Sequence, residues 1–195
     1  MGSEGFVDPV AIDVSRLVPR KVASLYSHLV TRPTGRAVRL AVEERLAEST
    51  HPSLSVIDLS EVHVLDYSCA DEVVAKLLLR WTEPRTRPEV FLLFKGLHDH
   101  HRGPVEAVLD RHGLAAVAEV GGGRYELVGV HSPEEGRGWS FLETHRTVSS
   151  NQLEDASGGR AVEDALDSLA RRRLVLKNGR SGAFHALSSF LTAGP

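Results

Sequence analysis

Cysteine is almost absent from this chain, since Cys69 is the only one among its 195 residues. A single thiol cannot close an intramolecular disulfide, and a chain without disulfides fits a reducing compartment. We therefore expect a cytoplasmic protein whose fold depends on its hydrophobic core.

Long apolar runs are also absent. No stretch reaches the roughly 18 apolar residues that a membrane-spanning helix needs. The first ten residues, MGSEGFVDPV, have no basic segment followed by an apolar one, as a secretory leader would. We expect no membrane partner.

Charge of one sign is scarce as well. The net charge is −3 and the isoelectric point is near 6.4, which excludes a protein that coats nucleic acid or anionic lipid by bulk charge, although a local basic patch remains open. With 42% hydrophobic and 25% charged residues, the composition is that of an ordinary globular protein. The length allows one large or two small domains.

The most informative stretch is residues 54–82, where an apolar strand leads through a serine into an amphipathic helix. Apolar residues recur at helical spacing, which predicts a helix lying on a sheet. They are Ala70, Val73, Val74, Leu77, Leu78 and Trp81.

Carboxylates gather where this strand ends and the helix starts. Asp58 and Asp66 lie near the strand ends, and Ser68 is followed three residues later by Asp71. The Ser68 and Asp71 spacing is that of a capping box, so we expect the helix to begin at Ser68.

This strand and turn resemble the STAS domain of anti-sigma-factor antagonists, in which a strand similar to V-I-D-L-S leads into a D-S-S-G turn. The family's second turn serine is phosphorylated by a partner kinase, and its position here is Ser68. Cys69 replaces the turn glycine, and Asp71 and Glu72 make the following positions more acidic than the family pattern. The resemblance covers about residues 8–130 and marks the chain as a divergent, STAS-like protein.

Two interpretations of Ser68 stay open. It is either a plain helix cap, which contributes about 1 kcal/mol, or a regulatory phosphoacceptor. A helix start favours a phosphate, whereas Asp66, Asp71 and Glu72 oppose it by like-charge repulsion.

The remaining elements of the first 130 residues predict an α/β layer. We expect strands over about 11–18, 89–95, 116–120 and 125–130, and helices over about 21–30, 34–48 and 104–112. The last helix should stop at Gly113, and the last two strands should form a loose hairpin around three glycines.

A second unit is expected over residues 131–195. Ser132-Pro133-Glu134-Glu135 is a helix-start pattern, followed by a short helix over 149–156, a longer one over 160–173, and strands over 174–176 and 183–187. This order resembles winged-helix domains. The chain is therefore divided into a STAS-like domain, 1–130, and a winged-helix-like domain, 131–195.

The winged-helix resemblance implies basic residues for DNA at one end of the long helix and on the wing. Between residues 145 and 195, seven Lys or Arg and five Asp or Glu give a net charge of +2, which is mild for a DNA footprint. Protein docking and DNA binding by this unit both stay open. The DNA-binding candidates are Arg160, Arg171, Arg172, Arg173, Lys177 and Arg180.

The remaining motifs in the sequence do not indicate a catalytic site. His98, Asp99, His100 and His101 are adjacent on a loop and lack a second ligand pair, so we expect no metal. The segment 31–36 precedes a helix and is interpreted as a helix start with a possible anion contact, not a Walker loop. No catalytic triad or cofactor motif is present in the sequence, so we expect no enzyme and no cofactor.

The leading hypothesis is a non-enzymatic regulatory protein that binds a protein partner, such as a kinase or anti-sigma factor, through Asp58, Asp66, Ser68 and Asp71. The alternative is a DNA-binding transcription regulator whose α/β domain senses a ligand or dimerises. A structural subunit of a larger assembly, including a homo-oligomer, is the third class.

Overall fold

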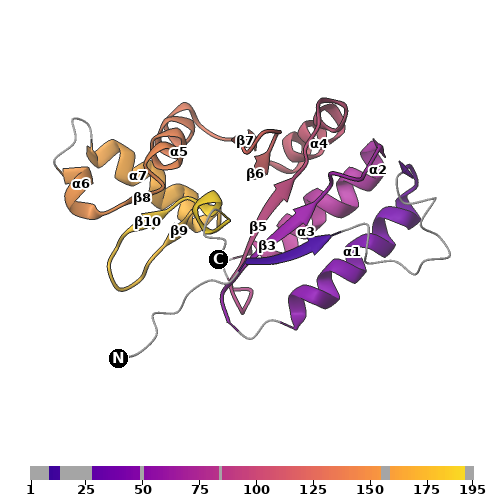
Figure 1. The fold of residues 1–195 in the computed structure, drawn as a ribbon, viewed down its shortest axis with the longest axis horizontal. Coiled ribbons are helices and arrows are strands. Elements are labelled where there is room, and N and C mark those ends of the chain that lie inside the picture. The colour runs from indigo at the N-terminus through magenta and orange to yellow at the C-terminus, as the bar shows by residue number, and fades with distance from the viewer. Residues whose placement is uncertain (1–8, 14–27, 49–50, 84, 155–158, 192–195) are drawn as a thin grey trace.

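The computed structural model describes residues 9–13, 28–48, 51–83, 85–154 and 159–191. They form a mixed α/β fold in which helices and a small C-terminal unit surround a central sheet (Figure 1).

The central sheet has five strands in the order β1-β3-β5-β6-β7. The first four are parallel, and β7 returns antiparallel to β6. Their bounds are Pro9–Asp13 for β1, Ser53–Asp58 for β3, Val90–Lys95 for β5, Ala115–Glu119 for β6 and Tyr125–Gly129 for β7. The strands predicted over 89–95, 116–120 and 125–130 and the hairpin are confirmed, with small shifts of their ends. Of the strand predicted over 11–18, residues 11–13 belong to β1, and 14–18 lie outside the described residues.

One face of the sheet is covered by helices. The parallel strands follow one another in chain order, and right-handed crossovers then place every connecting helix on the same side. These helices are α1 (Arg32–Ala47), the segments α2 (Tyr67–Ala70), η2 (Asp71–Ala75) and α3 (Lys76–Trp81), and α4 (Asp99–His112). The predicted stripe from Ala70 to Trp81 is buried in the core on this face, which confirms the helical spacing.

The segments α2, η2 and α3 follow one another without a break and are called helix 67–81 below. Its middle segment, η2, is a π-helix, in which the Lys76 N–H donates to Asp71 O. The sequence periodicity did not predict this wider turn.

The other face of the sheet packs against the C-terminal unit. A second core joins sheet residues such as Leu54, Phe91 and Val117 to Trp139 and Leu166 of the unit. The two parts of the chain therefore share a hydrophobic core, because a singly wound sheet leaves one face for another element to cover.

In its described residues, the C-terminal unit contains three α-helices, a short 3-10 helix and a small sheet. The helices are α5 (Pro133–His145), α6 (Ser150–Glu154) and α7 (Gly159–Arg171), and the short strands are β8 (Thr147–Val148), β9 (Leu176–Lys177) and β10 (Phe184–His185), followed by η3 (Leu187–Phe190). The strand order is β8-β10-β9. Ser132 and Glu135 form the capping box expected at the start of α5.

Two predictions near the ends of elements differ from the structure. The helix predicted over 21–30 lies mostly outside the described residues, and its end is the strand β2 (His28–Leu29), which pairs in parallel with β4 (Val64–Leu65). The helix predicted from residue 104 starts at Asp99 and contains Pro104 within it, and it ends at Gly113 as expected.

Arg173 links the C-terminal unit to helix 67–81. It is only 5% exposed, and its guanidinium donates to the backbone oxygens of Trp81, Glu83 and Thr86 at 2.5 to 3.0 Å. These bonds fix the carboxyl end of the helix and the loop after it.

Among the residues that the structure describes, no helix is both long enough and apolar enough to span a membrane.

Candidate functional site at the strand-to-helix turn

The turn between β3 and helix 67–81 is held in place by a small parallel sheet. Strand β4 pairs with β2, and the Asp66 N–H donates to Leu29 O at 2.9 Å. Leu29 and Leu65 are buried under this sheet. The start of the helix is therefore fixed to the segment that leads into α1.

Asp66, and not Ser68, caps the helix. The Asp66 carboxylate accepts the Cys69 N–H at 2.8 Å and the Ser68 hydroxyl at 2.9 Å, and the first helical residue is Tyr67. The prediction of Ser68 as the cap was wrong because Asp caps helices as well as Ser. The Ser68 hydroxyl supports the cap from inside the first turn.

Exposed apolar residues lie beside this turn, because the Asp66 N–H donates to Leu29 O and the Cys69 thiol to Thr31 O on either side of Val30. Val30, Val64 and Tyr67 are 47%, 40% and 61% exposed, and Ser68 is half-buried. Val30 follows Leu29 and Val64 precedes Leu65, and these two leucines pair in the small sheet that leads into the helix. We call Val30, Val64, Tyr67 and Ser68 the turn surface.

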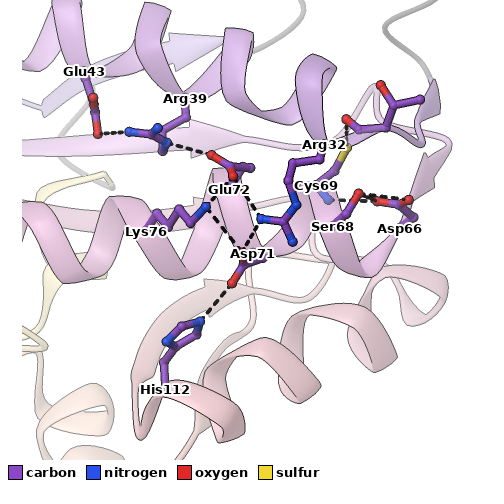
Figure 2. A network of polar contacts seen from close by, with 11 residues as sticks. Arg32, Arg39, Glu43, Asp66, Ser68, Cys69, Asp71, Glu72, Lys76 and His112 are labelled. Carbon is purple, nitrogen blue, oxygen red and sulfur yellow. Dashed lines mark hydrogen bonds and ion pairs between the residues drawn. The ribbon is translucent and has the colours of Figure 1, made fainter.

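Beside the turn surface, buried acids meet bases from three helices (Figure 2). Both acids belong to η2, and the bases come from α1, α3 and α4. The charged cluster consists of Asp71, Glu72, Arg32, Arg39, Lys76 and His112.

Asp71 contacts three bases. Its carboxylate lies 2.8 Å from Arg32 Nη1, 2.8 Å from His112 Nε2 and 3.5 Å from Lys76 Nζ. Burial alone would raise the pKa of Asp71, but the hydrogen bonds from Arg32 and His112 outweigh it and lower the pKa to about 2. Asp71 is therefore ionised at neutral pH despite being 6% exposed.

Glu72 also contacts three bases. Arg32 Nη1 lies 3.1 Å and Arg39 Nε 3.0 Å from its carboxylate, and Lys76 donates to it as well. Burial opposes ionisation, but Lys76 and Arg39 lower the pKa of Glu72 below its usual value. Arg39 pairs in addition with Glu43 of α1 at 2.8 Å.

Close packing of α1 on helix 67–81 brings these charges together. A Cβ added to Gly35 would lie 2.9 Å from the Cys69 Cα and 3.2 Å from the Glu72 Cβ, closer than side chains normally approach a backbone. Glycine at this position therefore allows Arg32 and Arg39, which flank it on α1, to reach the acids of η2.

Cys69 is sealed beneath the turn. It is fully buried, and its thiol donates to Thr31 O at 2.9 Å. Burial and the nearby Asp66 carboxylate raise the pKa of Cys69 to about 11. The thiol therefore stays protonated, and Cys69 acts as a small buried residue of the core.

The sequence-predicted docking residues separate into three environments. Asp66 and Ser68 bond to each other at the turn, whereas Asp71 is buried in the charged cluster. Asp58 ends β3 elsewhere on the edge, where it pairs with Lys95 at 3.1 Å and accepts the Ser60 N–H. Of these four residues, Ser68 belongs to the turn surface.

The predicted DNA-binding residues also separate. Arg160, Arg171 and Arg180 are exposed. Arg172 instead donates to Glu135 and to Val130 O, and Lys177 pairs with Asp167 at 2.5 Å. Together with buried Arg173, half of the candidates hold the protein's own structure together.

The histidine group at the start of α4 is structural at its centre. His101 is fully buried, its Nε2 lies 2.7 Å from Val62 O, and its Nδ1 accepts the His98 N–H. Both ring nitrogens are therefore in use. Within the described residues, no group of three or more His, Cys, Asp or Glu side chains is arranged to hold a metal ion.

Sequence reasoning missed the bases of the charged cluster. Arg32 and Arg39 are seven residues apart, a spacing that places both on one helix face. Of the two, Arg32 falls in the segment 31–36 that was interpreted as a helix start with a possible anion contact, and Arg39 falls in the helix after it. Arg32 instead contacts protein carboxylates, and Thr31 caps α1.

Comparison of the chain with family models, with curated proteins and with solved structures found no match.

Proposed function

We propose that this chain is a non-enzymatic regulatory protein that binds a protein partner through the turn surface, with phosphorylation of Ser68 as the switch. The observation that carries the proposal is the exposure of Val30, Val64 and Tyr67 at the turn that holds half-buried Ser68. Exposed apolar and aromatic side chains around a polar centre are typical of protein-binding sites.

The turn surface is preorganised for binding. Asp66 caps the helix, β2 and β4 hold the segment before it, and the charged cluster fixes the first turns from the side. A partner that docks here orders few additional residues, which reduces the entropy lost on association.

Phosphorylation would change both the charge and the local bonds of this surface. The Ser68 hydroxyl donates to Asp66, and a phosphate dianion has no proton to donate and repels the carboxylate. An apolar contact made over Val64 and Tyr67 would then have to bury this dianion. We therefore expect phosphorylation to weaken the interface.

The STAS resemblance supports the same role. By the resemblance, Ser68 corresponds to the phosphoserine of that family, and a kinase or an anti-sigma factor is the partner that the resemblance implies. The order α5, β8, α6, α7, β9, β10 and the strand order β8-β10-β9 support a winged-helix arrangement for the C-terminal unit.

Phosphate mapping tests the switch. The purified chain is incubated with ATP and lysate of the cells that produce it, and intact mass and peptide mapping locate any added phosphate. We expect one phosphate at Ser68 and none on Ser68→Ala. Absence of phosphate from Ser68 under every condition tested would retire the switch while leaving partner binding open.

Surface variants test the binding. Tyr67→Asp and Val64→Asp should each abolish capture of the partner that the unmodified chain retains from lysate. Leu79→Asp is the matched control, because Leu79 is 45% exposed on the same helix but lies three turns away. Equal capture by all three variants would contradict binding at the turn surface.

DNA binding by the C-terminal unit is the second candidate. It is favoured by the exposure of Arg160, Arg171 and Arg180 and opposed by the internal contacts of Arg172 and Arg173. A gel-shift salt series tests it. A steep loss of affinity with salt that weakens in Arg171→Ala and Arg180→Ala would support DNA binding, and weak binding without salt dependence would discard it.

A further inference from the structure

We propose that Arg32 is the receptor for a phosphate on Ser68, and that it leaves Asp71 and Glu72 to bind it. This inference rests on the proposed function, because it describes how the same switch works. In this proposal, one cation of the charged cluster, Arg32, moves from the buried acids to the phosphate beside it.

Helix geometry places Arg32 next to Ser68. Asp71 and Glu72 lie three and four residues after Ser68, so all three side chains share one face of helix 67–81. Arg32 Nη1 bridges the two carboxylates at 2.8 and 3.1 Å. Its guanidinium therefore lies one turn from Ser68, and Figure 2 shows it between the carboxylate of Asp71 and the serine.

The cluster can release Arg32 without leaving an acid unpaired. Glu72 keeps Arg39 at 3.0 Å and Lys76. Asp71 keeps His112 at 2.8 Å and Lys76 at 3.5 Å. Loss of one cation therefore does not create the isolated buried charge that makes most broken ion pairs costly.

Arg32 is also the base most able to move. Its side chain is 50% exposed, compared with 17% for Arg39 and 37% for Lys76. A guanidinium binds phosphate oxygens through two parallel N–H donors, a stronger contact than it makes by sharing one nitrogen between two carboxylates. The phosphate is thus a better acceptor for Arg32 than its present partners.

The nearby Asp66 carboxylate makes a cation beside the phosphate more favourable. The carboxylate that now accepts the Ser68 hydroxyl would face a dianion. Figure 2 shows Arg32 and Asp66 on opposite sides of Ser68, so Arg32 can offset the repulsion. Phosphorylation then exchanges a bond between Ser68 and Asp66 for one between the phosphate and Arg32.

The test uses the full chain with phosphoserine encoded at position 68, so that no kinase or partner is required. A ³¹P NMR titration gives the second pKa of the phosphate, which a bound guanidinium lowers. We expect a lower value in the folded protein than in the same protein in concentrated urea. Equal values in the two states would overturn the proposal without any variant.

Variants assign the effect to Arg32. Arg32→Gln should raise the phosphate pKa by at least about half a unit, and Arg32→Lys should keep most of the lowering because the positive charge remains. Arg36→Gln is the control, since Arg36 is exposed one turn further along α1. An unchanged pKa in Arg32→Gln, or an equal rise in Arg36→Gln, would overturn the assignment.

The two proposals fail separately. If the phosphate pKa does not depend on Arg32, this inference is wrong, but partner binding at the turn surface is unaffected. Failure of any partner to bind Tyr67 and Val64 removes the proposed function, while the ³¹P titration still reports whether Arg32 binds the phosphate.

Discussion

The two ends of helix 67–81 are held by different kinds of polar contact. Near the amino end, Asp71 and Glu72 are surrounded by bases from three helices. At the carboxyl end, Arg173 reaches across from the C-terminal unit and donates to three backbone carbonyls. Within the described residues Arg173 forms no ion pair, and burial lowers its pKa.

The contacts at the two ends therefore differ in how easily one partner can be lost. In the charged cluster, each acid has several partners, so one base can leave while the others remain. At the other end, the guanidinium of Arg173 is shared by the carbonyls of Trp81, Glu83 and Thr86. Thr86 O also accepts from Arg87 Nη1 and Glu83 O from the Thr86 N–H, so the buried bond to Trp81 O is the one that depends most on Arg173. The cluster is therefore suited to a change of ion-pair partners. Arg173 is suited to holding the C-terminal unit in a constant position on helix 67–81.

Removal of the anchor should have the largest effect. Arg173→Met removes the donor of the buried Trp81 carbonyl and two further bonds to the loop, and should lower the free energy of unfolding by about 3 kcal/mol. Arg171→Met, at an exposed neighbouring position, should change it by less than about 0.5 kcal/mol. Urea unfolding measures both, and similar values for the two variants would show that Arg173 is not an anchor.

Crowding the cluster end should have a slightly smaller effect. Gly35→Ala places a Cβ 2.9 Å from the Cys69 Cα, and we expect a loss of about 2 kcal/mol although alanine favours helix. In Gly136→Ala the new Cβ faces only the exposed ring of His131, so this variant should keep or gain stability. A stable Gly35→Ala protein would contradict the close approach of the two helices.

Acid should weaken the cluster end. The pKa of Asp71 falls from 3.8 to about 2 on folding, so its contribution is complete above pH 4 and is lost as pH falls toward 2. The loss amounts to about 2 kcal/mol. Urea unfolding across this range should show a weaker acid dependence for Asp71→Asn, and an unchanged dependence would exclude Asp71 as its source.

The smallest effect should come from the cap. Asp66→Ala removes the acceptor of the Cys69 N–H and should lower the free energy of unfolding by about 1 kcal/mol. Ser68→Ala leaves that bond intact and should change it by a few tenths of a kcal/mol. A larger loss for Ser68→Ala than for Asp66→Ala would restore Ser68 as the cap.

Much of the fold follows from local patterns in the sequence. Alternation, the helical stripe, the Ser132 capping box and the stop at Gly113 all depend on residues close together in the chain. The α/β class and most elements were predicted for this reason. The cap at Asp66 was missed because Asp66 and Ser68 are both good caps and the sequence does not show which one leaves the helix.

The charged cluster and the anchor were not predictable in the same way. Arg32 meets Asp71 across 39 residues, and Arg173 meets Trp81 across 92. Only the packing of three helices on one face, and of the C-terminal unit on the other, brings these residues together. From the sequence, Asp71 was predicted to dock a partner and Arg173 to bind DNA, whereas both side chains are buried within the chain.

Photo-crosslinking at the turn surface tests the central proposal most directly. A benzophenone amino acid in place of Tyr67 is activated in lysate of the producing cells, once with serine and once with encoded phosphoserine at position 68. We expect one crosslinked partner protein with serine at position 68, no such crosslink with phosphoserine, and none from the same probe in place of Leu79. Identical crosslinking with serine and phosphoserine, or from both probe positions, would contradict it.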